Sequence, residues 1–209
     1  ETPSFDEFRQ AFVEASIVIR TKFPNAKVTE FNLIQYQAAY DHVLKCSARL
    51  ENETKFLKKV VELIYNPVGA NDHSNCKKKV LQAADLFDLN RRSLVVLAAL
   101  SCIYEPRGGA GFLAARQVLK PKQNYQETDA FNALSDLRAL ELFIAFCSIE
   151  APRVYFCTCD RALAGLWCGL KPKNARWEND VLTFDLSIDE TLFPSLPIED
   201  RIENVLLDY

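Results

Sequence analysis

Apolar side chains recur at steps of three and four residues over residues 4–23, which is the spacing of one face of an α-helix. The same spacing predicts helices over residues 30–50 and 53–65, and another from residue 77 to about residue 86. We therefore expect a helical N-terminal portion that covers about residues 1–90.

The segment from Leu94 to Tyr104 is apolar on nearly every side. This pattern predicts a buried helix, with a central strand as the alternative. Residues 106–111 follow and contain three glycines. They lack the lysine and hydroxyl residue of a P-loop, so they predict a flexible loop. Residues 181–185 predict a strand late in the chain.

Residues 125–167 form the stretch on which the functional interpretation depends. They predict a helix with an acidic face, a break at Ala151-Pro152, a strand over residues 153–158 and the first turns of another helix over residues 162–167. The strand is rich in β-forming residues and almost uncharged, as is typical of a strand covered on both faces in a parallel sheet.

Together these elements predict an α/β fold that is helix-rich, with a small parallel sheet flanked by helices in three layers. A chain of 209 residues is long enough for one well-buried domain, so we expect a single domain over residues 1–209 with the helical portion at its start.

Composition narrows the class of protein. The chain is 49% hydrophobic and 25% charged, which is ordinary for a folded domain. Its net charge of −3 gives no overall basic field for nucleic acid, although a bound metal would supply positive charge locally. Seven cysteines without a C-x₂-C pair predict neither a disulfide framework nor a zinc site. No apolar run reaches the length of a membrane span, so we expect no membrane partner and a cytoplasmic location.

Three carboxylates in this stretch are candidates for a metal site. Asp160 follows the predicted strand, where ligand chemistry collects in an open α/β sheet. Asp129, Asn132 and Asp136 share one face of the preceding helix. Mg²⁺ and Mn²⁺ prefer such oxygen ligands. The alternative is structural, because an aspartate before a helix commonly caps it and an acid in a first turn complements the helix dipole. Capping does not explain Asp136.

Residues 156–163, with their T-x-D motif, resemble the strand end of PIN-domain nucleases, and residues 136–145 resemble the acidic helix that precedes it there. The resemblance implies a metal-dependent ribonuclease or flap-type nuclease. It implies that Asp136 and Asp160 hold Mg²⁺ or Mn²⁺ and that Asp129 is a further catalytic acid, with Glu141 as the substitute metal ligand if the helix register is different. Residues 4–8 do not match the apolar strand ending in aspartate with which such domains open.

Two similar basic segments lie on either side of the acidic residues in the sequence, Leu119-Lys120-Pro121-Lys122 and Leu170-Lys171-Pro172-Lys173. In a nuclease their lysines would contact phosphates of RNA or another single-stranded nucleic acid without reading sequence. The alternative is a pair of turns with solvated lysines. Thr158 and Arg161, next to Asp160, complete the candidate substrate-binding residues.

The sequence thus predicts a metal-dependent nuclease, acting on RNA, in which the metal activates a water molecule and stabilises charge on the phosphate. The alternative is a non-catalytic interaction protein, either a degenerate domain of the same fold or a helical module that binds a protein partner or a second copy of itself. Carboxylates of Asp136 and Asp160 within reach of one cation favour the nuclease, and acids that only cap helices favour the interaction protein.

Overall fold

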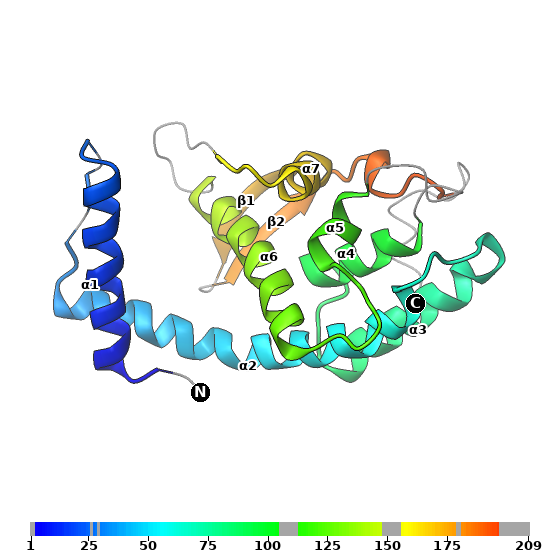
Figure 1. Cartoon of the computed structure of the whole chain (residues 1–209), viewed down its shortest axis with the longest axis horizontal. Helices are drawn as coiled ribbons and strands as arrows, with labels where there is room; N and C mark the ends of the chain where they lie inside the picture. The colour runs from blue at the N-terminus through cyan, green and yellow to red at the C-terminus, as the bar shows by residue number, and fades with distance from the viewer. Residues whose placement is uncertain are drawn as a thin grey trace. The chain divides into compact units, whose positions relative to one another are not determined.

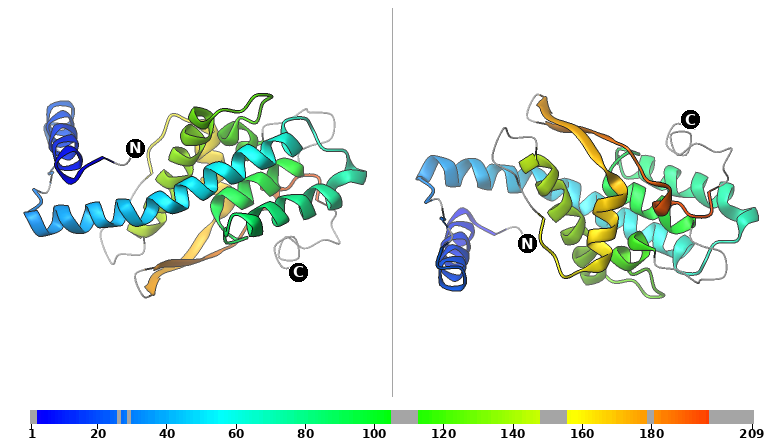
Figure 2. Two further views of the ribbon diagram at one scale, coloured as in Figure 1. Left: turned by 90° about the horizontal axis from the view of Figure 1, so that it is seen from below. Right: turned by 90° about the horizontal axis from the view of Figure 1, so that it is seen from above.

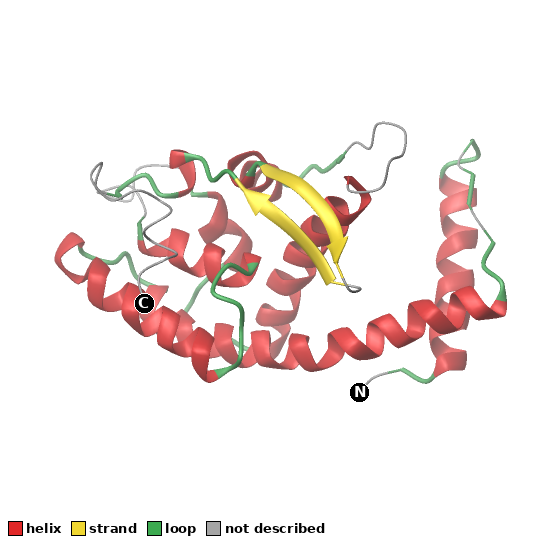
Figure 3. Cartoon of the chain, turned by 180° about the vertical axis from the view of Figure 1, so that it is seen from behind, coloured by secondary structure: helices red, strands yellow, loops and turns green. Residues whose placement is uncertain are grey.

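The structure is a computed structural model that describes residues 3–25, 27–28, 30–104, 113–147, 156–178 and 181–196. The chain divides into two compact units, Glu1–Glu51 and Asn52–Tyr209. Helices make up most of the described chain, and its strands form one two-stranded sheet (Figure 3). The predicted α/β fold with a parallel sheet between helix layers is therefore wrong.

The first unit begins with α1 (Phe5–Lys22), which confirms the helix predicted over residues 4–23. Ser4 caps this helix, because its hydroxyl accepts a hydrogen bond from the Glu7 amide at 3.3 Å. The Glu7 carboxylate in turn accepts one from the Ser4 amide at 2.7 Å. This reciprocal capping box satisfies backbone N–H groups that the first helical turn leaves without partners.

Aromatic side chains hold α1 against the start of α2 (Leu33–Ile64). The ring of Phe12 lies 5.4 Å from that of Tyr36, and the ring of Phe8 lies 5.6 Å from that of Tyr40. Phe31, just before α2, lies 4.8 Å from Phe12. These contacts cover only one side of α1, and none of its residues is buried.

α2 is a single helix where the sequence predicted two, over residues 30–50 and 53–65. The expected break fails because Glu51 and Asn52 include neither glycine nor proline, and glutamate favours a helix. α2 begins in the first unit and ends in the second. Its second half buries a face of five apolar side chains: Phe56, Leu57, Val60, Val61 and Ile64.

The centre of the second unit is α4 (Leu94–Ile103), in which every residue is buried. This confirms the buried helix and excludes the alternative of a central strand. α4 packs against α3 (His73–Leu86), α5 (Ala114–Leu119) and α6 (Glu127–Cys147), as Figure 1 shows. Because α4 carries no charge and is apolar on all sides, it is stable only when helices cover it in this way.

α7 (Arg161–Leu170) packs on α5 and on the short helix η3 (Glu190–Leu192). Gly169 makes the second contact possible, because a Cβ atom placed there would lie only 2.4 Å from Cγ of Leu192. The Gly169 carbonyl also accepts a hydrogen bond from the Asp189 amide at 2.8 Å. The absence of a side chain at Gly169 therefore allows η3 to lie directly against α7.

The strands are β1 (Pro172–Glu178) and β2 (Val181–Leu186), which pair antiparallel. β2 confirms the late strand, whereas β1 was not predicted and contains Lys173. Two residues separate β1 from β2, too few for the crossover that parallel strands need. The hairpin lies on one side of the helices of its unit, and none of the described helices covers its outer face (Figure 2).

The strand predicted over residues 153–158 is wrong where the structure describes it, because residues 156–158 have no regular secondary structure. Residues 153–155 and the loop predicted at 106–111 lie outside the described residues. Phe156 instead packs its ring 5.2 Å from that of Phe143 on α6. A side-chain contact with a helix takes the place of the expected pairing with a neighbouring strand.

Replacing Gly169 with alanine is expected to destabilise the second unit by about 1 to 3 kcal/mol, because the added methyl group must displace Leu192. Chemical denaturation followed by circular dichroism measures this loss. The matched control is Gly69→Ala, where the new Cβ atom would meet only the Asp72 carboxylate at 3.7 Å and φ is −66°. Equal stability of the Gly169→Ala protein and the wild type would contradict the packing described here.

Candidate functional site

Asp160 is the N-cap residue of α7. One carboxylate oxygen, Oδ1, accepts hydrogen bonds from the Ala162 amide at 2.7 Å and the Leu163 amide at 3.0 Å. The Thr158 hydroxyl accepts a hydrogen bond from the Asp160 amide at 3.0 Å. Thr158 thus orders the turn before the helix, and Asp160 has the structural role that the sequence allowed as the alternative.

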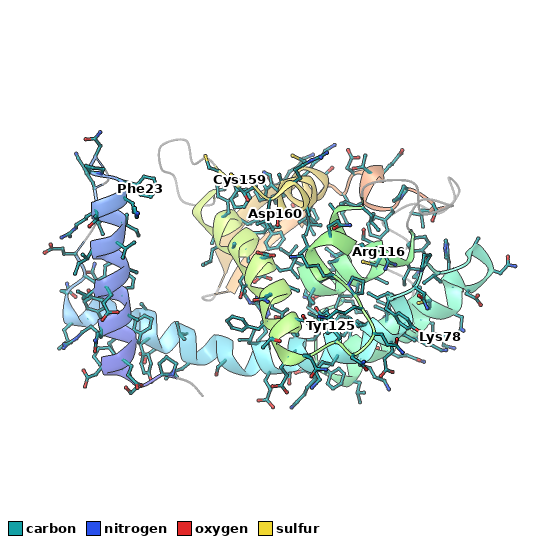
Figure 4. The ribbon with its side chains drawn as sticks, viewed as in Figure 1. Phe23, Lys78, Arg116, Tyr125, Cys159 and Asp160 are labelled. Atoms are coloured by element: carbon teal, nitrogen blue, oxygen red, sulfur yellow. The ribbon has the colours of Figure 1, made fainter. Side chains whose placement is uncertain are left out.

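Aromatic packing fixes the start of α7 beside α6. The ring of Trp167 on α7 lies 4.6 Å from that of Phe143 on α6, and Phe156 contacts both rings. Figure 4 shows Asp160 at the start of α7, next to α6. Asp160 therefore lies near the helix that carries the other predicted carboxylates.

Asp136 on α6 is close enough to Asp160 for their charges to interact. Burial raises the pKa of Asp136, and the negative charge of Asp160 raises it further. The positive charge of Lys120 lowers the pKa of Asp136, opposing both effects. The structure thus brings together two predicted carboxylates and one predicted lysine, Asp136, Asp160 and Lys120.

Asp129 has a different set of contacts. Its carboxylate lies 2.8 Å from Nζ of Lys122 and accepts a hydrogen bond from the Gln126 amide at 2.9 Å. The Lys122 contact and then the Gln126 amide lower the pKa of Asp129. Asp129 and Asp136 are about 10 Å apart along the axis of α6, since seven residues separate them. Asp129 therefore orders the loop before α6, at a distance from Asp160.

Glu141 belongs to an ion-pair network within the second unit. The guanidinium of Arg138 donates hydrogen bonds to the carboxylates of Glu141 and Glu53. Glu53 on α2 is 2% exposed, so its hydrogen bond with Arg138 lies in a setting that water scarcely reaches. The sequence did not predict that Glu53 is buried, because charged side chains are mostly exposed.

The two similar basic segments share a structural role. Lys120 ends α5 and Lys171 ends α7, each in the left-handed conformation, with φ of 47° and 42°. A proline follows each of them, as is common after such a helix end. Nζ of Lys171 lies 2.5 Å from the Asp189 carboxylate. The repeat is thus a helix-ending motif, which explains its recurrence without reference to phosphate.

The remaining candidates are exposed. Lys173 lies on β1, opposite Asp185 of β2 in the strand register. Arg161 is the first residue of α7. The predicted substrate-binding role of Arg161 and Lys173 stays a prediction.

Among the described residues, no three side chains of His, Cys, Asp or Glu lie close enough to hold one metal ion. The charge of Asp160 acts on Asp136, so these two carboxylates are the remaining candidates for a divalent cation. Magnesium is often bound through one or two carboxylates together with phosphates of the substrate. The pair therefore has suitable donor atoms for a divalent cation, with Asp129 and Glu141 engaged elsewhere.

Comparison with protein-family models, with curated proteins and with solved structures found no match to this chain. No helix in the described part of the chain is long and apolar enough to span a membrane.

Replacing Asp136 with asparagine is expected to raise the melting temperature at neutral pH, because ionised Asp136 is partly buried and faces the charge of Asp160. A raised pKa in the folded state means that the folded chain binds the proton more tightly than the unfolded chain. The ionised carboxylate is thus destabilising above its folded pKa, and the advantage of Asp136→Asn should disappear below about pH 4.

Melting curves followed by circular dichroism between acidic and neutral pH measure this effect. The matched control is Asp129→Asn, for which the sign is opposite, since the folded pKa of Asp129 is lowered and its ionised form is stabilising. A lower melting temperature of Asp136→Asn at neutral pH would show that the carboxylate has a stabilising partner instead.

Proposed function

We propose that this chain is an interaction protein and that its first unit is the surface through which it contacts a partner. Exposed apolar side chains support this function. Most of the large apolar side chains that are exposed in the described residues belong to this unit: Val13, Ile17, Val18, Ile19, Phe23, Leu33, Ile34, Val43 and Leu44. Phe23 is 65% exposed and Ile34 is 80% exposed.

Single exposed apolar residues are normal, but a concentration of them marks a contact surface in many proteins. In this unit the aromatic contacts of Phe8 and Phe12 join α1 to α2 without burying any residue of α1. A helix pair of this kind leaves much apolar area in water, and a partner that covers it gains the corresponding hydrophobic free energy.

The acids of the second unit support the same function. Asp160 caps α7, Asp129 pairs with Lys122, and Glu141 pairs with Arg138. Helix capping was the role that the sequence predicted for these acids in an interaction protein, and ion pairing is a second structural role. Most of the predicted catalytic acids therefore have structural explanations that need no substrate.

A photo-reactive benzoylphenylalanine at position 17 tests this function in cells that express the chain. Irradiation is expected to give a discrete cross-linked product, because Ile17 is 56% exposed on α1. The matched control replaces Lys22, which is exposed and lies about 140° away from Ile17 around the helix. No product from position 17, or equal products from both positions, would contradict a specific contact at this surface.

The second candidate function is the metal-dependent nuclease, and one observation favours it. Burial and then the negative charge of Asp160 raise the pKa of Asp136, and a perturbed carboxylate beside a second one is a candidate for a functional site. Both capping hydrogen bonds of Asp160 end on Oδ1, so its Oδ2 is the oxygen that would face a cation.

In this function, two carboxylates would bind the metal and a lysine would contact the substrate. Asp136 and Asp160 would hold Mg²⁺ or Mn²⁺, and the Lys120 side chain would contact a phosphate of the RNA next to Asp136. A bound divalent cation lowers the pKa of a water molecule and stabilises negative charge on phosphate. The capping bonds of Asp160 would keep its carboxylate in a fixed orientation.

Cleavage of a mixed single-stranded RNA pool in the presence of Mn²⁺ tests the nuclease. Wild type is expected to cleave, and Asp160→Asn and Asp136→Asn are expected to lose at least about a hundredfold in rate. Asparagine caps helices about as well as aspartate, so Asp160→Asn changes the charge and keeps the fold. Asp129→Asn is the control, since its carboxylate pairs with Lys122. Absent cleavage by folded wild type, or equal cleavage by all variants, would exclude this function.

A further inference from the structure

Two exposed cysteines, Cys157 and Cys159, lie one residue apart just before α7, and both carry free thiols. We call Cys157-Thr158-Cys159 the C-x-C segment. Figure 4 shows Cys159 beside Asp160 at the start of α7. Free cysteine is among the residue types that are most often buried, so two exposed thiols in one short segment are unusual.

Contacts on both sides hold the C-x-C segment in place. On one side, the ring of Phe156 packs 5.2 Å from that of Phe143 on α6 and 6.4 Å from that of Trp167 on α7. On the other side, Asp160 caps α7. Within the segment, the Thr158 hydroxyl accepts a hydrogen bond from the Asp160 amide at 3.0 Å. The backbone that carries both thiols is therefore fixed before any ligand binds, which lowers the entropy cost of binding.

The spacing of the two cysteines suits a small ion held between their sulfur atoms. Two residues along a chain span at most about 7 Å between Cα atoms. Two metal–sulfur bonds of about 2.3 Å in a line span about 4.6 Å. Rotation about the Cα–Cβ bonds of Cys157 and Cys159 can bring their sulfur atoms to that separation, so both thiols can reach one ion.

The number of ligands indicates which ion fits the C-x-C segment. In the part of the chain that the structure describes, no group of three His, Cys, Asp or Glu side chains could hold a metal ion, so the segment offers two ligands. A structural zinc site needs four ligands. Thiolates are soft ligands that favour monovalent copper, and this ion is stable between two sulfur atoms in a line.

We propose that Cys157 and Cys159 bind one monovalent copper ion in two-coordinate geometry. Each thiol releases its proton to solvent as its sulfur bonds the ion, and the copper stays monovalent throughout. The site goes beyond the interaction function, because it needs neither the first unit nor a protein partner. It also differs from the candidate Mg²⁺ site, whose ligands would be the carboxylate oxygens of Asp136 and Asp160.

Competition for monovalent copper tests the site in the full 209-residue chain, reduced with a phosphine and kept free of oxygen. The competing chelator is bicinchoninate, whose copper complex is coloured. Wild type is expected to remove one copper ion per chain from the chelator. Cys157→Ser and Cys159→Ser are each expected to weaken binding at least about a hundredfold, because loss of even an outer-shell partner of a metal site costs about ten- to a hundredfold.

Cys147→Ser and Cys168→Ser are the matched controls, since both thiols are exposed and neither has another cysteine within two residues. Both control variants should bind copper as wild type does. X-ray absorption of copper-loaded wild type should show two sulfur neighbours around the ion. This measurement uses wild type alone, so it remains decisive if a serine variant fails to fold.

Each of four results would overturn the site. The chelator could retain all the copper, or Cys157→Ser and Cys159→Ser could bind copper as tightly as wild type does. A control variant could lose as much affinity as these two variants. The absorption spectrum could show three or more sulfur neighbours around the bound ion.

Discussion

The second unit depends on burying α4 on every side. Its ten residues, Leu94 to Ile103, are all buried. Ser101 carries the one side-chain hydroxyl among these ten residues. A helix of this composition has no stable exposed state, so α3, α5 and α6 must each present an apolar face to it. Burial of α4 thus determines which faces of the surrounding helices point inward. Charged residues such as Lys78 and Asp136 lie on their other faces.

Periodicity was sufficient to predict most of the helices. α1, α4 and α7 lie where the apolar spacing placed them, because helical periodicity is a local property of the sequence. The predicted strand near position 156 is wrong, since β-forming residues alone do not define a pairing partner. Pairing is set by tertiary contacts, and here Phe156 packs on Phe143. The sequence offered no local signal for this contact.

In the candidate site, too, the sequence predicts the local features and does not predict the contacts that depend on tertiary packing. Capping by Asp160 follows from its position before α7, and the sequence predicted it as an alternative. The approach of Asp136 to Asp160 depends on how α6 and α7 pack, which spacing along one helix does not reveal. The ion pair between Arg138 and Glu53 joins residues 85 positions apart, so no local motif indicates it.

The contact between α4 and η3 has a consequence for the order in which the second unit forms. The Ser101 hydroxyl donates a hydrogen bond to the Leu192 carbonyl, and 91 residues separate the two in the chain. The Ser195 amide donates to the Tyr104 carbonyl across a similar separation, at 3.0 Å. During synthesis, these two hydrogen bonds at the C-terminal end of α4 therefore cannot form until residues 192–195 have been made. The nascent chain exposes part of its most apolar helix until then, which makes late synthesis the stage most vulnerable to aggregation.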